Sequence, residues 1–255
     1  MAVSFLRQLA AEILFEDEDL VVIDKPSSLR VLPDRFDASL PNLYEILKNE
    51  RGKIFPVHRI DKQTSGIVLF AKRETSHAAL NEAFEQKLVM KEYTALVLGI
   101  PPQDTGVVDL PLGEDPAHRG RMKIDRKGGK ESTTEYRVVE RFAGHSFLRV
   151  LPKTGRTHQI RVHLSAVGYP IVADPKYGDG KPLYLSSIKP RYRSSGEERP
   201  LIARTALHAA LLDIVHPVSG MHMKFEAPLP EDMKITLKYL RKFCGLKSTP
   251  DARGD

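Results

Sequence analysis

Apolar residues near the start of the chain come in short runs that are separated by polar turns. The run Leu20–Ile23 follows an acidic corner, Glu16–Asp19, and the shorter apolar run Ile13–Phe15 precedes that corner. This arrangement predicts an antiparallel hairpin. Residues Gly66–Lys72 form a nearly continuous apolar run rich in branched side chains, which predicts a strand buried on both faces.

Four stretches repeat apolar residues at helical spacing. The first runs from Ser39 to Glu50, with Ser39 as its predicted cap and apolar residues at 40, 43, 44 and 47. The second contains Leu80, Ala83, Phe84 and Leu88. The third runs from about Thr157 to Val167 and is closed by Gly168 in the left-handed cap position. The fourth covers about Pro230 to Phe243.

Further runs with strand character complete the pattern. They cover residues 91–99, where Tyr93, Ala95 and Val97 share a face, and residues 133–140, 146–151, 206–216 and 221–227. The last two flank Pro217–Gly220, a hairpin signature. The Gly, Pro, Ser and charge content of residues 177–200 predicts a long surface loop. The strands mostly adjoin through hairpins, with helices interspersed irregularly, so the predicted class is α+β with a mainly antiparallel sheet in one domain.

Composition narrows the class of protein. The chain has 255 residues and a single cysteine, Cys244, which excludes an internal disulfide and a thiolate zinc cluster. Its longest apolar runs are far shorter than the roughly 20 residues that cross a bilayer. The N-terminus lacks the pattern of an export signal. We therefore expect a cytoplasmic protein without a membrane partner, and we take a monomer as the default because no long exposed apolar stripe is evident.

The formal net charge is +6, which favours polyanions as partners. The basic residues gather in two runs, His118, Arg119, Arg121, Lys123, Arg126, Lys127 and Lys130 around the pair Gly128–Gly129, and Lys181, Lys189, Arg191, Arg193 and Arg199. One interpretation is two solvated loops. The other is two arms that bind phosphates without reading sequence.

Two segments concentrate residues that could do chemistry. His58–Gly66 places Asp61 on a polar loop before the buried strand, although an Asp before Thr-Ser-Gly is also a common turn former. In Lys153–Leu164 the helical spacing puts Arg161 off the apolar stripe, where a surface salt bridge is the alternative to a functional role. His158 and His163 are five residues apart, which does not align them on one helical face, so we expect no metal site.

The segment His58–Gly66 closely resembles the signature of the RluA family of RNA pseudouridine synthases. Four further segments agree with the family in the same order: Leu20–Pro26; Glu92–Ala95; Thr154–Leu164 with 168–171 and Asp174–Gly178; and 207–209 with 216–217. The resemblance spans roughly residues 13 to 232. It implies the pseudouridine synthase catalytic fold, with a central active-site cleft, over residues 13–243. We expect residues 1–12 to be an N-terminal extension and residues 244–255 to be a disordered tail.

The resemblance implies an isomerase that converts specific uridines to pseudouridine in structured RNA, either ribosomal or transfer RNA, without a cofactor. Asp61 matches the family's catalytic aspartate, Arg161 its partner arginine, and Tyr93 the tyrosine that stacks on uracil. Asp61 either attacks C1′ or removes a ribose proton, and the sequence does not choose between these routes. Arg59 would fill the space left by the extruded base, or else assist Asp61. The same resemblance assigns RNA and base binding to His58, Thr64, Arg156, His158, Gln159 and Leu164, although Leu164 and Tyr93 also fit a packing role.

The chain departs from the family pattern at two loop positions. Lys25-Pro26-Ser27-Ser28 lacks the glycine that often follows the Lys-Pro pair, and Ala173 stands where a glycine is common. The residues before Ile13 leave no room for an S4-type RNA-binding domain, so we expect the catalytic domain to bind RNA by itself.

Two alternative functions remain. One is a non-catalytic RNA-binding or ribosome-assembly factor on the same scaffold. The other is a glycosidase, which would need a second carboxylate near Asp61.

Overall fold

The computed structural model describes residues 6, 9–34, 37, 39–194 and 196–246. Most of the tail that we expected to be disordered, and much of the predicted N-terminal extension, lie outside these residues. Among the described residues, no helix has the length and apolar character that crossing a bilayer requires.

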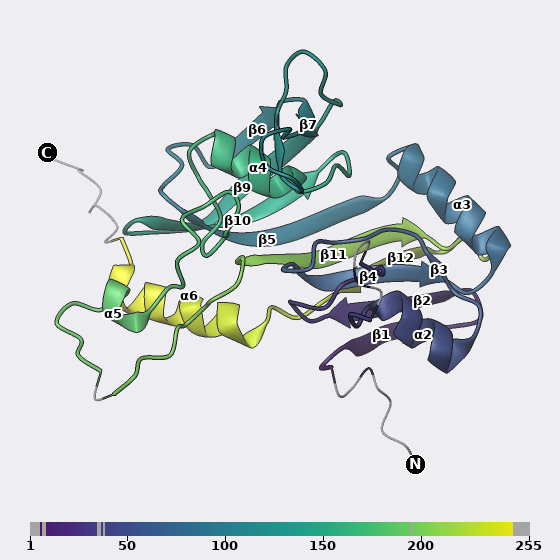
Figure 1. Cartoon of the computed structure of the whole chain (residues 1–255), viewed down its shortest axis with the longest axis horizontal. Helices are drawn as coiled ribbons and strands as arrows, with labels where there is room; N and C mark the ends of the chain where they lie inside the picture. The colour runs from purple at the N-terminus through teal and green to yellow at the C-terminus, as the bar shows by residue number, and fades with distance from the viewer. Residues whose placement is uncertain (1–5, 7–8, 35–36, 38, 195, 247–255) are drawn as a thin grey trace, which may run out of the picture.

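A ten-stranded mixed sheet forms the centre of the fold (Figure 1). Its main path runs β1-β2-β4-β11-β5-β10-β9-β6, with β12 paired to β11 and β3 to β4. The strands are β1 (Glu12–Glu16), β2 (Leu20–Lys25), β3 (Phe55–Pro56), β4 (Ser65–Ala71), β5 (Met90–Leu98), β6 (Thr105–Asp109), β9 (Thr133–Phe142), β10 (His145–Pro152), β11 (Leu207–Val215) and β12 (His222–Glu226). A separate two-stranded hairpin consists of β7 (Leu112–Glu114) and β8 (Met122–Ile124).

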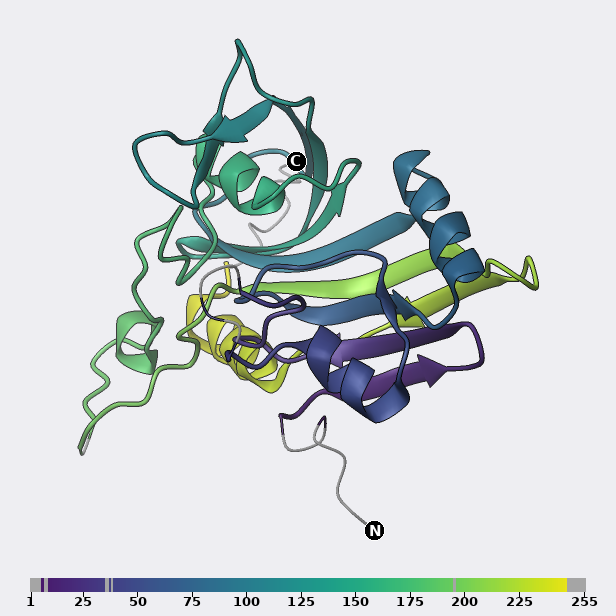
Figure 2. The same ribbon diagram turned by 45° about the vertical axis from the view of Figure 1, so that its right-hand side comes forward.

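The helices gather around the two halves of this sheet (Figures 1 and 2). They are α2 (Leu43–Arg51), α3 (Glu74–Glu85), α4 (Gln159–Ala166), α5 (Leu185–Ile188) and α6 (Glu231–Cys244). In both views α4 lies with β6, β7 and β9, whereas α2 lies with β1 and β2. Strands β5 and β11 run between these two groups. The predicted α+β class with a mainly antiparallel sheet is confirmed.

The one parallel pairing among the named strands of the described chain joins β4 to β11, where Ala209 faces Gly66. Gly66 has φ +107°, and a Cβ atom there would lie 2.2 Å from the carbonyl oxygen of Ala209. The two backbones therefore approach so closely that only glycine fits. This contact fixes the start of β4, directly after the Asp61 loop.

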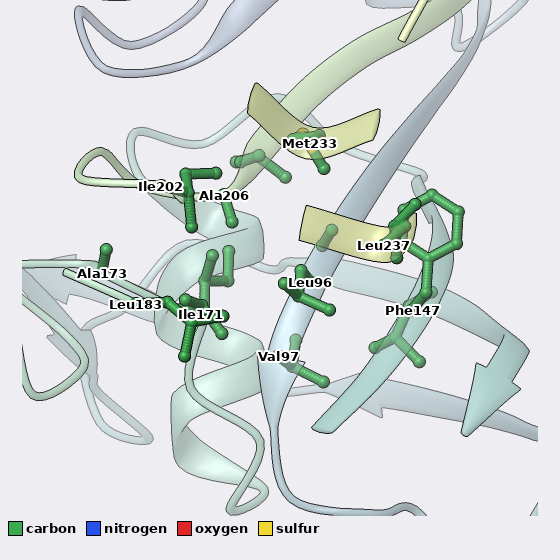
Figure 3. Close-up of a cluster of buried hydrophobic side chains, with 14 of the residues drawn as sticks. Leu96, Val97, Phe147, Ile171, Ala173, Leu183, Ile202, Ala206, Met233 and Leu237 are labelled. Atoms are coloured by element: carbon green, nitrogen blue, oxygen red, sulfur yellow. The ribbon is translucent and has the colours of Figure 1, made fainter. Parts of the chain in front are cut away.

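Three clusters of buried apolar side chains hold the sheet to its covering elements. The largest lies between β5, β10, α6 and the segments that lead to α6, and Figure 3 shows Leu96, Ile171 and Leu237 packed within it. The other two clusters cover the faces of β2 and β4. Tyr93 packs against two of the three clusters, so it stands at the junction between the two halves of the molecule.

Three helix boundaries differ from the predicted ones. Helix α2 begins at Leu43 with Asn42 as its cap, and Ser39 lies in a turn before it. The reason is Pro41, which disfavours helical backbone at the residue before it. Helix α3 ends at Glu85, so Leu88, which is 69% exposed, is not part of a buried stripe. Helix α4 begins only at Gln159 because His158 has a left-handed backbone, with φ 56°.

The first basic run was interpreted as part of a loop, but it contains β8 and an ordered turn. The Asp125 side chain accepts hydrogen bonds from the backbone N–H groups of Lys127 and Gly128. A Cβ atom on Gly129 would lie 2.4 Å from the carbonyl oxygen of Asp125. Gly129 is therefore required for close packing rather than for flexibility. Strands β6 and β7 and the short helix α5 were also missed, because elements of three to five residues leave too little periodicity to detect.

Candidate active site

The loop that precedes β4 presents Asp61 at the junction of the two halves. The turn uses the backbone of this residue, because the Asp61 carbonyl accepts the Thr64 N–H at 3.1 Å. The carboxylate remains 24% exposed and is directed to other partners. The turn-former interpretation therefore explains the backbone of Asp61 but not the placement of its side chain.

Arg161 lies between two carboxylates. Its Nη1 donates to Oδ2 of Asp61 at 2.9 Å, while Nε and Nη2 donate to the two oxygens of Asp174 at 2.7 and 2.8 Å. The Arg161 side chain is 4% exposed and that of Asp174 is fully buried. The predicted position of Arg161 off the buried face of α4 is wrong, because this helix is surrounded by β8, β9 and the segment 171–177 and buries six consecutive residues.

The ion pair between Arg161 and Asp174 keeps both groups charged. Burial by itself would lower the pKa of Arg161, but its bonds to Asp174 and Asp61 raise that pKa well above its usual value. Burial would likewise raise the pKa of Asp174, and the guanidinium of Arg161 together with two backbone N–H groups lowers it instead. The result is a fixed positive charge that faces Asp61.

A cavity of about 330 Å³ opens beside this ion pair. Its walls are formed by the Asp61 loop, by β5, by the start of α4 and by Leu207 of β11. Tyr93 lines the cavity, and burial together with the Asp61 carboxylate raises the pKa of its hydroxyl, so the phenol stays protonated at neutral pH. The volume is at the lower end of the range for small-molecule sites, which suits a single base-sized group.

His158 links the site to the chain around residue 177. Its Nδ1 lies 2.7 Å from the hydroxyl of Tyr177, and its Nε2 lies 3.8 Å from Oδ2 of Asp61. Burial lowers the pKa of His158 to about 4, although the Asp61 carboxylate acts in the opposite direction. The imidazole is therefore neutral at neutral pH.

His58 and Gln159 line the cavity, but one ring nitrogen of His58 and all the polar side-chain atoms of Gln159 are bonded inside the protein. The Nε2 atom of His58 accepts the Leu69 N–H at 3.1 Å, and burial lowers the pKa of this ring to about 3. The amide of Gln159 donates to the Thr133 carbonyl and to the Thr134 hydroxyl, while its oxygen accepts the Thr154 hydroxyl and the Arg156 N–H. Because this fills the bonding capacity of a glutamine side chain, Gln159 orders the loop and has no free polar atom for a base.

The remaining predicted residues divide between the cavity rim and the core. Thr64 lines the cavity and is buried, whereas Arg59 and Arg156 line it from exposed positions. The predicted role of Leu164 in base binding does not fit the structure. Leu164 is fully buried in the largest apolar cluster, which also contains residues of β5 and β10, and it does not line the cavity.

Sequence reasoning gave no role to Asp174 and Tyr177, which hold Arg161 and His158 in place. The signal was present, because both residues lie in the segment Asp174–Gly178 that matches the family, but nothing in its pattern showed which side chains it would contact. The apolar wall residue Leu207 was missed for the same reason.

Among the described residues, one group has the spacing of a metal site, Asp17, Asp19 and His216. Internal contacts account for this group. Asp17 accepts two backbone N–H groups and lies 3.0 Å from the His216 ring nitrogen, and Asp19 accepts the Ser76 hydroxyl. It lines no part of the cavity described above.

Known proteins with this sequence pattern share an activity on RNA. A family model described as RNA pseudouridylate synthase matches residues 19–166. The ribosomal large subunit pseudouridine synthase D of Nitrosomonas europaea is 40% identical over 237 residues, which cover 90% of this chain and 65% of that protein. The protein of the same name from Pseudomonas aeruginosa is 37% identical over 246 residues, which cover 92% of this chain and 73% of that protein. The chain thus matches about two thirds to three quarters of the length of these relatives.

Solved structures resemble the fold over nearly the same extent. The human RNA pseudouridylate synthase domain containing 4 superposes with a TM-score of 0.68 and 28% identity, covering 90% of this chain and 92% of that one. The human RNA pseudouridylate synthase domain containing 1 gives a TM-score of 0.66 and 26% identity, covering 86% and 83% of the two chains.

Proposed function

This chain belongs to the RNA pseudouridylate synthase family, within the RluA group, and from that premise we propose that it isomerises uridine to pseudouridine in structured RNA. We place the activity in residues 13–243. The names of the bacterial relatives support large-subunit ribosomal RNA as the substrate.

The observation that carries the proposal is the position of Asp61. One oxygen of its carboxylate is held by Arg161 at 2.9 Å, and among the described residues no hydrogen bond reaches the other oxygen, Oδ1. The carboxylate lies at the wall of a base-sized cavity and is oriented by the adjacent guanidinium. Such an arrangement leaves one charged oxygen available for a bound ribose.

The reaction requires such a carboxylate. The N1–C1′ bond of uridine breaks, the uracil turns, and a C5–C1′ bond forms, while C5 loses a proton and N1 gains one, so that the product is an isomer of the substrate. Asp61 acts either as a nucleophile at C1′ or as a base at the ribose, and both routes need its charged form. In this proposal Arg161 orients Asp61 and Tyr93 stacks on the uracil, where its protonated hydroxyl lies beside the reacting base.

The base must leave its helix or loop to enter the cavity. Extrusion costs a few kcal/mol and is easiest in a loop or bulge. Arg59 and Arg156, both exposed at the rim, are placed to contact the phosphates or the vacated space, and Arg59 also lies 3.3 Å from the Thr157 hydroxyl. We therefore assign RNA contact to the rim arginines and packing or loop-ordering roles to His58, Gln159 and Leu164.

The two alternative functions fit the site less well. A pure RNA-binding factor would have no use for an ionised carboxylate that a buried arginine aims into a small cavity. A glycosidase would need a second carboxylate as its general acid, and Asp174, the acid beside Arg161, is fully buried and bonded to that arginine through both oxygens.

The test is the substitution Asp61→Asn. The amide cannot attack C1′ or accept a ribose proton, so we expect pseudouridine formation to fall at least about 10³-fold, or about 4 kcal/mol in barrier height. Activity is followed by the release of tritium from C5-labelled uridine in a large-subunit ribosomal RNA transcript. RNA binding and the unfolding midpoint should change little, because the amide keeps the shape of the side chain.

The matched control is Asp104→Asn, which makes the same change at a carboxylate that is 81% exposed and does not line the cavity. This variant should retain full activity. Turnover by Asp61→Asn at a rate near that of the unaltered protein would overturn the assignment.

A further inference from the structure

Tyr177 contacts three polar residues of the site, Asp174, Arg161 and His158. Its backbone N–H donates to Asp174 at 3.1 Å, and its ring lies under the Arg161 guanidinium, 5.0 Å from centroid to carbon. Its hydroxyl lies 2.7 Å from Nδ1 of His158. The Tyr177 carbonyl accepts the hydroxyl of Ser165 in α4 at 2.7 Å, which anchors the residue to the helix that carries Arg161.

The same tyrosine is bound to the β7–β8 hairpin. The backbone N–H of Met122, the first residue of β8, donates to the Tyr177 hydroxyl at 2.7 Å. The Arg121 guanidinium lies 5.4 Å from the ring centroid and also donates to the carbonyl of Lys176. The hairpin carries residues of the first basic run, which extends from His118 to Lys130. It lies beside β6 at the upper end of the molecule in Figure 1, where β7 is labelled.

The hydrogen bonds around the Tyr177 hydroxyl favour one position for the His158 proton. A hydroxyl has one proton to donate, and its oxygen here already accepts the Met122 N–H. Its proton is therefore free to go to Nδ1 of the neutral His158 ring, which leaves the ring's own proton on Nε2. The opposite arrangement would turn the Nε2 lone pair toward the negative Oδ2 of Asp61, 3.8 Å away, and would be repelled.

We propose that Tyr177 is a positioning residue: its hydroxyl holds the His158 proton on Nε2, facing Asp61, and couples this arrangement to the β7–β8 hairpin. This proposal rests on the proposed function, because it assigns the network a role in aiming the catalytic carboxylate. Arg161 and His158 then approach the same oxygen, Oδ2, of Asp61. Tyr177 holds both side chains in position. The other oxygen stays directed toward the cavity.

The proton position is tested without any assay of activity. In protein labelled with ¹⁵N-histidine, the nitrogen shifts of His158 report which ring nitrogen carries the proton, and the variant His158→Asn identifies its signals by their disappearance. We expect the Nε2–H form in the unaltered protein and a mixture of both forms in Tyr177→Phe, which keeps the ring under Arg161 but removes the hydroxyl. A ring that carries its proton on Nδ1, or one that Tyr177→Phe leaves unchanged, would refute the proposal even if the enzyme is active.

The positioning role is tested by kinetics on the same RNA transcript. Tyr177→Phe removes two hydrogen bonds of the hydroxyl, one with His158 and one from the Met122 N–H. Loss of the bond with His158 is expected to lower kcat about tenfold, with KM changed less than about twofold. Asn tolerates the left-handed backbone of position 158, so His158→Asn is a usable background. In that background Tyr177→Phe should cause no further loss, because its effect passes through His158.

Tyr44→Phe on α2 serves as the control, since it removes a hydroxyl from a side chain that does not line the cavity and should leave kcat unchanged. A kcat of Tyr177→Phe equal to that of the unaltered protein, or losses that simply add in the double variant, would count against coupling through His158.

Discussion

At the scale of single residues, the site depends on the unequal burial of two carboxylates that share one arginine. Asp174 is fully buried and binds Arg161 through both of its oxygens, whereas Asp61 is partly exposed and binds it through one. The buried acid neutralises the arginine inside the protein and fixes its orientation. In the proposed reaction, the partly exposed acid is then free to react while Arg161 holds it in place.

Asp174→Asn should therefore be strongly destabilising. An amide in this position would turn a donor toward the guanidinium and would remove the charge that compensates a buried cation, so we expect the free energy of unfolding to fall by about 3–5 kcal/mol. Urea unfolding followed by circular dichroism measures this change. Glu74→Gln, which likewise replaces a carboxylate by an amide, but in an ion pair whose side chains are both 70% exposed, should leave the midpoint unchanged. Equal midpoints for Asp174→Asn and the unaltered protein would show that the buried pair does not hold the fold.

At the scale of secondary-structure elements, close backbone contacts set the position of the Asp61 loop. The parallel contact between Gly66 and Ala209 holds the start of β4 against β11. Two loop positions that lack the family's usual glycine nevertheless keep a left-handed backbone, Ser28 with φ 71° and Ala173 with φ 56°. Both positions thus adopt a backbone that glycine favours, at the expense of some strain.

Gly66→Ala should destabilise the protein by about 3 kcal/mol or more, since the new methyl group would collide with the Ala209 backbone and the positive φ would be strained. Because the collision lies next to the Asp61 loop, we also expect kcat to fall more than the fraction of folded protein does. Unfolding midpoints and tritium-release rates measured on the same preparations separate these effects. Gly196→Ala, at a position with open space and no positive φ, is the comparison and should match the unaltered protein in both assays. If both alanine variants behave alike, the close approach at Gly66 has no energetic importance.

At the scale of the whole molecule, buried imidazoles make stability depend on pH. Burial lowers the pKa of His58 to about 3 and those of His158 and His208 to about 4. In the unfolded chain these rings take up protons near pH 6.5, so below that value the unfolded state binds more protons and stability falls as the pH falls. Asp24 acts in the opposite direction, because burial raises its pKa to about 6. This single carboxyl opposes three imidazoles, so we expect the effect of the imidazoles on stability to be larger.

We therefore expect the Tm to be several degrees lower at about pH 5.5 than at about pH 7, with each imidazole contributing up to about 1.4 kcal/mol per pH unit. Scanning calorimetry at the two pH values measures the change. His208→Gln should show a smaller difference between the two Tm values, whatever its stability at pH 7, since it lacks one of the rings. A Tm that stays constant or rises between pH 7 and pH 5.5 would contradict the assignment of these rings as neutral in the folded protein.

The sequence alone determined the features that depend on neighbouring residues. The hairpin of β1 and β2, the buried strand β4, the hairpin of β11 and β12 and the helix α6 follow from periodicity and turn residues, and the structure confirms them. The motif around Asp61 and the segment around Arg161 were recognisable for the same reason, because each is a continuous run of residues with a specific order.

Only the tertiary structure decided which side chains meet. Arg161 and Asp61 are 100 positions apart, and Asp174 and Tyr177 come from yet another segment, so no local pattern could place them around one guanidinium. Helical spacing put Arg161 on an exposed face, whereas α4 is covered on nearly every side by β8, β9 and the segment 171–177. Periodicity records the average polarity of a helix face, but burial depends on which other elements pack against that face, and this is settled only when the whole sheet is assembled.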